Sequence, residues 1–327
     1  MTGRLEAEFR AKRSDGRKLL VPYITGGYPG WQEAIRAAAA EGADAVEIGV
    51  PFSDPVMDGP VIQQASQAAL EAGATPAAVL DEVPSLDVGI PLLVMTYYNL
   101  VHHDGHRRFA HRLVQAGVSG CILPDLPLEE SEPWCRAADH EGVETVMLAA
   151  PTAPDARLPL VAARARGFLY SVGLLGVTGE RATLASTATE LAARLKQITD
   201  VPVLVGVGVS DAEQAYQATR VADGVIQGAS MVRRLMESGP DAVGDYVAEV
   251  RRAIDVASGS LADPFGGGRE ARARGPSLRH VVDSAESNVM VTVRSRHALG
   301  GCGSRSVPTA REMTHGHAPR RTSFDFC

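Results

Sequence analysis

The sequence predicts an α/β protein of the (β/α)₈-barrel class, and three observations support this. Eight short apolar runs alternate with longer, Ala-rich amphipathic runs over roughly the first 258 residues. Each short run is almost continuously apolar, as expected for parallel strands that are buried on both faces. Eight strand–helix units in about 250 residues are typical of a closed TIM barrel that forms a single domain.

The short apolar runs are the predicted strands. In chain order they are Leu19–Thr25, Asp44–Gly49, Leu92–Tyr98, Gly120–Pro124, Thr145–Ala149, Gly167–Ser171, Pro202–Gly206 and Gly224–Gln227. The helical patterns between them include Trp31–Glu41, Ser131–Glu141 and Asp211–Arg220, and a helix over Pro240–Val256 completes the eighth unit. An extra helix over Arg4–Arg13 is expected to cap the bottom of the barrel.

An open, doubly wound sheet is the alternative architecture. Such sheets usually have fewer strands, and they carry a glycine-rich dinucleotide fingerprint after the first strand. The segment Thr25–Gly30 reads TGGYPG and lacks that fingerprint. The closed barrel is therefore preferred.

The composition changes past about Ser258. Residues 259–327 hold ten Arg, no Lys and six Asp or Glu, which makes the segment net positive, and Gly, Ser and Pro are frequent. A short strand over Asn288–Val293 has no obvious sheet to join. We therefore predict a barrel catalytic domain over 1–258 and a disordered Arg/Gly/Ser-rich tail over 259–327.

Composition also excludes several classes of function. The net charge of −7 argues against a nucleic-acid binder. No apolar run of 18 residues and no secretory signal are present, so a cytoplasmic protein without membrane contact is expected. His102, His103 and His106 could suggest a metal site, but a solvated loop and helix start is preferred because no carboxylate or Cys ligand set accompanies them. No metal, ATP or other cofactor is expected.

Glu47 is the first candidate for chemistry. It lies inside the second predicted strand between apolar neighbours, where an unpaired carboxylate costs several kcal/mol. It is either a core glutamate paired with a basic residue or a general acid/base with a raised pKa that faces the barrel mouth.

Asp58 is the second candidate, in the segment Pro51–Pro60 that follows the same strand. Three prolines, two aspartates and a glycine stiffen and turn this segment. Asp58 could be an ordinary turn residue. Its place directly above Glu47 favours a second carboxylate over the same substrate, since active sites of these barrels lie at the carboxyl ends of the strands.

The residues from Glu47 to Pro60, EIGVPFSDPVMDGP, resemble the signature of the tryptophan synthase alpha chain. Further segments resemble that family in the same order, from about residue 18 to 256. They are LVPYITGGYP (20–29), MTYYN (95–99), LPDLPLEE (123–130), YSVGLLGVTG (170–179), VGVG (205–208) and GASMV (228–232). The form is actinobacterial-like, with an atypical C-terminal extension.

This resemblance implies a lyase of tryptophan biosynthesis. The implied reaction is retro-aldol cleavage of indole-3-glycerol phosphate to indole and glyceraldehyde 3-phosphate. Glu47 would deliver a proton to indole C3 and take one from the side-chain hydroxyl. Asp58 would accept a hydrogen bond from the indole N–H as positive charge develops on the ring. Tyr170 would form a hydrogen bond near Glu47 and shape the pocket.

The resemblance and the glycine pattern together imply a phosphate site after the last two strands. Its expected backbone groups come from Gly179, Gly206, Gly208, Gly228 and Ala229. Ser230 follows them, and the helix start at this point offers unpaired N–H groups to an anion. Ala229 stands where the family more often has Ser, and Leu174 stands where many members have Arg, so Ala229 is given only a backbone role.

The apolar indole pocket is expected from residues at the strand ends. They are Tyr23, Met95, Tyr97, Ile122, Pro124 and Val207. Asn99 and Asp125 are expected to organise loops, in a region that in the family faces the beta subunit. The resemblance thus implies a beta-chain partner in an α₂β₂ tetramer.

Three other functions remain open from the sequence. One is a freestanding lyase that releases indole, which would share these residues. A second is a sister phosphate-binding barrel, either an isomerase or an indole-glycerol-phosphate synthase. The synthase needs a catalytic Lys at a strand end, and Lys12, Lys18 and Lys196 all lie elsewhere. A third is a non-catalytic barrel that only activates a partner.

Overall fold

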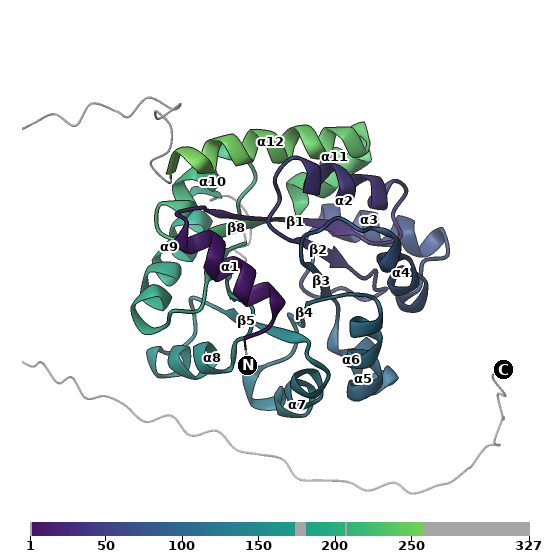
Figure 1. The fold of residues 1–327 in the computed structure, drawn as a ribbon, viewed down its shortest axis with the longest axis horizontal. Helices are drawn as coiled ribbons and strands as arrows, with labels where there is room; N and C mark the ends of the chain where they lie inside the picture. The colour runs from purple at the N-terminus through teal and green to yellow at the C-terminus, as the bar shows by residue number, and fades with distance from the viewer. Residues whose placement is uncertain (1, 174–180, 207, 258–327) are drawn as a thin grey trace, which may run out of the picture. The chain divides into compact units, whose positions relative to one another are not determined.

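The computed structural model describes residues 2–173, 181–206 and 208–257. Eight parallel strands close into a barrel in chain order, with β1 paired to β8 (Figure 1). The strands are β1 Leu19–Thr25, β2 Val46–Gly49, β3 Leu92–Met95, β4 Gly120–Ile122, β5 Glu144–Ala149, β6 Leu169–Ser171, β7 Val203–Val205 and β8 Gly224–Gln227. The predicted (β/α)₈ barrel is confirmed.

Helices surround the barrel (Figure 1). They are α1 Arg4–Ser14, α2 Trp31–Ala40, α3 Pro60–Glu71, α4 Pro76–Glu82, α5 Tyr98–Asp104, α6 His106–Gln115, α7 Glu132–Glu141, α8 Leu158–Arg164, α9 Arg181–Ile198, α10 Ala212–Thr219, α11 Ala229–Ser238 and α12 Pro240–Ala257. Short 3₁₀ turns η1 Val83–Ser85, η2 Leu128–Glu130 and η3 Asp155–Arg157 lie in the connections. None of the helices in the described part of the chain is both long and apolar enough to span a membrane.

The predicted strand ends agree within one or two residues, with one exception. Leu92–Tyr98 was expected to be a strand, but β3 ends at Met95 and α5 begins at Tyr98. The Asp125 carboxylate accepts hydrogen bonds from the Tyr98 N–H, at 2.9 and 3.1 Å, and so caps this helix start. His102 and His103 consequently lie in the last turn of α5 rather than in a loop.

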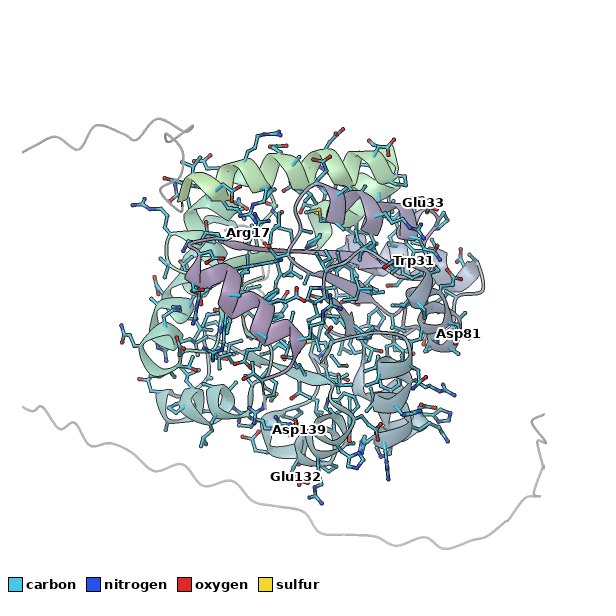
Figure 2. All side chains as sticks on the ribbon, in the orientation of Figure 1. Arg17, Trp31, Glu33, Asp81, Glu132 and Asp139 are labelled. Carbon is cyan, nitrogen blue, oxygen red and sulfur yellow. The ribbon has the colours of Figure 1, made fainter. Side chains whose placement is uncertain are left out.

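Apolar side chains form two concentric layers. The interior of the barrel is filled by alternate strand residues, among them Leu19, Val21, Leu93 and Ile226. A larger layer lies between the strands and the surrounding helices. On α7, for example, Trp134 and Cys135 are buried, whereas Glu132 and Asp139 point away from the barrel (Figure 2).

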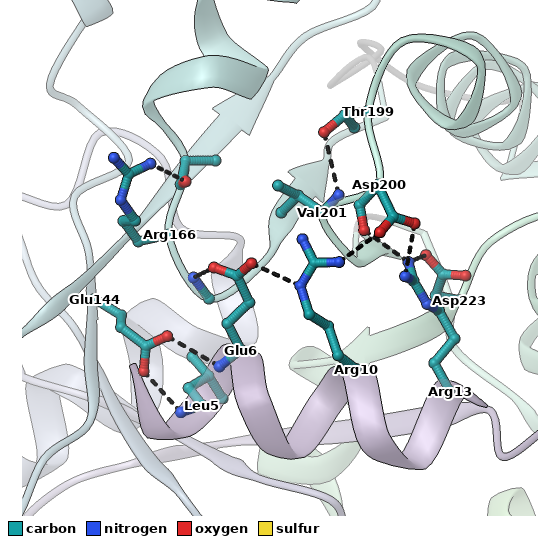
Figure 3. A network of polar contacts seen from close by, with 12 residues as sticks. Leu5, Glu6, Arg10, Arg13, Glu144, Arg166, Thr199, Asp200, Val201 and Asp223 are labelled. Atoms are coloured by element: carbon teal, nitrogen blue, oxygen red, sulfur yellow. Dashed lines mark hydrogen bonds and ion pairs between the residues drawn. The ribbon is translucent and has the colours of Figure 1, made fainter. Parts of the chain in front are cut away.

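Helix α1 closes the amino-terminal end of the barrel, as the sequence predicts (Figure 1). Its Leu5 and Phe9 are fully buried and belong to the interior layer. Glu144, the first residue of β5, accepts hydrogen bonds from the N–H groups of Leu5 and Glu6 at 2.7 and 2.9 Å (Figure 3). A carboxylate from the barrel therefore caps the positive end of α1.

The predicted tail over 259–327, including Asn288–Val293, lies outside the described residues. So do Leu174, Gly179 and Val207. The boundary between barrel and tail at residue 258 stays a prediction.

Candidate active site

Glu47 points into the barrel from β2. Its side chain is 1% exposed, and its Oε2 has no hydrogen-bond partner among the described residues. Burial, and then the neighbouring charge of Asp58, raise its pKa from 4.5 to about 8. No basic partner pairs with it in the described chain, so the alternative of an ion-paired core glutamate loses its basis. A pKa of about 8 favours the protonated form of Glu47 at neutral pH.

Asp58 lies in the loop after β2, close enough to Glu47 for its charge to act there. Burial raises its pKa, while a hydrogen bond with the Tyr97 hydroxyl opposes the rise. The same hydroxyl accepts a bond of 3.0 Å from the Met57 N–H, and the Tyr97 ring stacks on Phe52 at a centroid distance of 5.0 Å. Tyr97, expected as a pocket wall, thus also holds the Asp58 loop.

Tyr23 and Tyr170 flank Glu47, and a glycine makes room for each ring. Burial raises the pKa of both phenols most. The Asp58 charge and then the Glu47 charge raise it further at Tyr23, and the Glu47 charge does so at Tyr170. A Cβ on Gly49 would lie 1.8 Å from the Tyr23 hydroxyl, and one on Gly206 would lie 2.2 Å from the Tyr170 ring. The two rings therefore lie against the bare backbone of neighbouring strands.

We expect Gly206→Ala to displace the Tyr170 ring and to lower activity strongly. Overpacking of this kind costs about 1–3 kcal/mol of stability, because the added methyl would overlap the ring rather than a flexible chain end. Thermal unfolding and an assay for the indole release that the sequence resemblance implies would measure both effects. Gly59→Ala is the matched control for stability, since its methyl would meet nothing within 4 Å. Equal melting temperatures for the two variants would contradict the packing argument.

The raised pKa of Glu47 also makes stability depend on pH. Since the folded pKa of about 8 exceeds the value of 4.5 for an exposed carboxyl, the folded state binds the extra proton. The resulting stability is fully present below about pH 4.5 and is lost as the pH rises through about 8.

Glu47→Gln should abolish this part of the pH dependence. Urea unfolding at about pH 5 and about pH 9 should show a smaller loss of unfolding free energy in the variant. The difference should be about 1 kcal/mol or more, because each pKa unit is equivalent to ~1.4 kcal/mol. Identical losses in both proteins would show that Glu47 is not neutral in the folded state.

The backbone groups that are expected to bind the phosphate lie in the loops that follow the neighbouring strands β7 and β8. Gly228 immediately precedes α11, whose first N–H groups have no intrahelical partner. Gly208 has a φ of +88°, a conformation that favours glycine. The Gly206 N–H donates to the Ser171 carbonyl at 3.3 Å, and the missing side chain of Gly206 leaves room for the Tyr170 ring.

The expected indole-pocket residues that the structure describes face the same end of the barrel. Met95 and Ile122 are register partners on β3 and β4, and both contact the interior layer. Pro124 lines a cavity of about 310 Å³ together with Leu148. Leu148 is an inward residue of β5 paired with Tyr170. Leu148 was not among the residues expected from the sequence to line the pocket, because the strand's continuous apolar run does not show which residues face inward.

The remaining polar candidates do not enter this site. All three lysines make polar contacts near the amino-terminal ends of the strands. Lys12 forms an ion pair with Asp44, Lys196 forms one with Asp223, and Lys18 donates a hydrogen bond to a backbone carbonyl. His106 begins α6 and bonds the Tyr98 hydroxyl at 2.9 Å. Within the described ranges, no three His, Cys, Asp or Glu side chains are grouped to hold a metal ion.

A closed parallel barrel with a buried, protonated carboxyl beside a second carboxyl at its carboxyl-terminal mouth is the architecture of a (β/α)₈-barrel enzyme. Comparison with known proteins narrows this class. The family model described as "Tryptophan synthase alpha chain" matches residues 9–257. The chain belongs to the tryptophan synthase alpha chain family, whose members are lyases of tryptophan biosynthesis.

Individual relatives agree with this. The tryptophan synthase alpha chain of Streptomyces coelicolor is 46% identical over 239 residues, which cover 72% of this chain and 88% of that one. A tryptophan synthase structure from Mycobacterium tuberculosis superposes with a TM-score of 0.72 at 36% identity, over 78% of this chain and 99% of that one. The tryptophan synthase subunit alpha of Legionella pneumophila gives 0.71 at 31% identity, over 78% and 100%. The family resemblance is confirmed.

Proposed function

We propose that this protein cleaves indole-3-glycerol phosphate to indole and glyceraldehyde 3-phosphate, as the alpha subunit of tryptophan synthase. The observation that carries the proposal is Glu47, which is buried and has a pKa raised to about 8. It lies beside Asp58 at the barrel mouth, and its Oε2 has no hydrogen-bond partner among the described residues. A protonated carboxyl that faces a substrate is suited to start a reaction as a general acid.

Glu47 serves both proton transfers in this scheme. It first gives its proton to indole C3, which turns the ring into a leaving group and leaves a carboxylate. That carboxylate then takes the proton from the hydroxyl next to the breaking bond. The C3–carbon bond breaks, its electrons return to the indole ring, and an aldehyde forms. The proton count closes, because Glu47 ends protonated as it began.

Asp58 stabilises the charge that arises between these steps. Protonation at C3 makes the ring cationic at nitrogen, and an anionic partner for the N–H then gains Coulomb energy. The Tyr97 hydroxyl and the Met57 N–H fix the loop that presents Asp58. Tyr23 and Tyr170 bound the space around Glu47.

The phosphate is proposed to bind at the start of α11. Gly228, Ala229 and Ser230 would offer backbone N–H groups, and Gly208 would approach from the neighbouring loop. Gly206 is proposed to act through the room it leaves for Tyr170. Gly179 and Val207 keep their proposed roles in phosphate and indole binding from the resemblance alone.

A tryptophan synthase beta chain is the proposed partner, in an α₂β₂ tetramer of the cytoplasm. Family membership supports this. The exposed side chains of Val56 and Met57, next to Asp58, are apolar groups that a partner could cover. A freestanding indole-releasing lyase is the second candidate, because it would use the same site.

Indole release tests the function and separates these candidates. Purified protein would be mixed with indole-3-glycerol phosphate, with and without a beta chain. An alpha subunit should release indole slowly alone and many times faster with the beta chain, whereas a freestanding lyase should be fast alone. No cleavage under either condition would overturn the proposal and favour a non-catalytic barrel or a sister isomerase.

A further inference from the structure

The Tyr246 hydroxyl is a buried polar junction behind the proposed phosphate site. Tyr246 lies on α12 and is 2% exposed. Its hydroxyl donates to the Ser210 carbonyl at 2.9 Å and accepts from the Gln227 side-chain amide at 3.1 Å. One contact joins α12 to the loop after β7, and the other joins it to the last residue of β8.

The two hydrogen-bond partners of this hydroxyl lie next to the backbone segments that are proposed to bind phosphate. Ser210 ends the loop after β7, and its N–H and hydroxyl both bond the Gln214 side chain, at 2.8 and 3.0 Å, which fixes it to α10. Gln227 is the last residue of β8 and directly precedes Gly228. One phenol thus spans the gap between the loop that carries Gly208 and the start of α11.

Arg234 adds a third connection. Its guanidinium carbon lies 3.4 Å from the centre of the Tyr246 ring, and its Nη1 donates to the Ser230 carbonyl at 3.3 Å. The first turn of α11 is therefore held to the same ring. Burial raises the pKa of the Tyr246 phenol, and the nearby Ser230 hydroxyl, which has no hydrogen-bond partner of ordinary geometry among the described residues, opposes the rise.

We propose that Tyr246 is a positioning residue that sets the distance between the β7–α10 loop and the amino terminus of α11, and so determines phosphate affinity. The inference rests on the phosphate site proposed above. Backbone donors bind an anion well only when they are held at matching positions before it arrives. Tyr246 itself is buried behind the loops and touches neither the indole pocket nor Glu47 in the contacts of the described chain.

Tyr246→Phe tests this role, because it keeps the ring and the Arg234 contact but removes both hydrogen bonds. The dissociation constant for inorganic phosphate, measured by titration without turnover, should rise about three- to thirtyfold, because two hydrogen bonds are lost and their partners are left unpaired. KM for indole-3-glycerol phosphate should rise in parallel, with kcat changed less than about twofold. Binding of indole, which has no phosphate, should not change.

Two further variants keep the test informative. Gln227→Met removes only the hydrogen bond between β8 and the Tyr246 hydroxyl, so it should weaken phosphate binding less than Tyr246→Phe does. If Tyr246→Phe does not fold, the phosphate affinity of Gln227→Met tests the proposal instead. Tyr98→Phe removes a hydroxyl that bonds His106 on α6 and should leave phosphate binding unchanged.

The outcomes separate this inference from the proposed function. If the unaltered protein does not bind phosphate, both the phosphate site and this role of Tyr246 are wrong. If it binds phosphate and Tyr246→Phe binds equally well, the inference alone is overturned. A parallel loss of kcat, phosphate binding and indole binding would mean that Tyr246 merely supports the fold, which also overturns it.

Discussion

Glu47→Gln is expected to abolish cleavage of indole-3-glycerol phosphate while leaving the fold and substrate binding nearly intact. Gln has the shape of a protonated Glu and fits the same buried position, but it can neither give up nor accept the proton. Loss of a general acid/base reduces rates by roughly two to four orders of magnitude. Single-turnover indole release, with substrate binding measured separately, would give both quantities.

The matched control is Glu144→Gln at the opposite end of the barrel. This carboxylate caps α1 and lies in no contact with the mouth, so the substitution should lower stability but leave kcat near its original value. If Glu47→Gln kept near-normal turnover, the assignment of Glu47 would fail. If both variants lost activity together, the loss would reflect folding rather than proton transfer.

Asp58→Asn is expected to lower kcat by about two to three orders of magnitude, the range for removing one stabilising group from a transition state, with little change in KM. An indole N–H is neutral in the ground state, so an amide oxygen accepts its hydrogen bond almost as well as a carboxylate. The difference arises only after C3 is protonated, when the cationic ring needs an anion. The Asn side chain can still accept from the Tyr97 hydroxyl, so the loop should keep its place.

A beta chain should not rescue this variant. Partner binding can improve the arrangement of loops around the substrate, but it supplies no charge at the position of Asp58. Steady-state kinetics with the partner present would decide this, with Asp54→Asn, an exposed aspartate of the same loop, as control. A rise in KM alone would make Asp58 a ground-state binding residue.

The fold and the two carboxyls could be predicted from sequence because their signals are local. A parallel strand buried on both faces is a continuous apolar run, and Glu47 is conspicuous as a charge within one. The end of β3 could not be predicted. Met95–Tyr98 has residues that favour strands, and what ends the strand is the capping of Tyr98 by Asp125, which follows a different strand.

The packing of the Tyr23 and Tyr170 rings against Gly49 and Gly206 could not be predicted from the sequence either. Gly206 was expected to bind phosphate because it follows a strand near the right position. That Tyr170 lies against it depends on the register of β6 with β7, which no local pattern encodes. The same reason hid Leu148, since only register shows that it faces inward beside Tyr170.

The cap on α1 has a consequence for how the chain folds. The bond from the Leu5 N–H to Glu144 joins residues 139 positions apart in the sequence. During synthesis α1 emerges early, but neither its cap nor the interior that buries Leu5 and Phe9 exists until β5 and the closing strand β8 have been made. Contacts between residues this distant in the sequence slow folding. We therefore expect α1 to pack on the amino-terminal end of the barrel late in folding, and the Leu5 and Phe9 side chains to stay exposed to solvent until then.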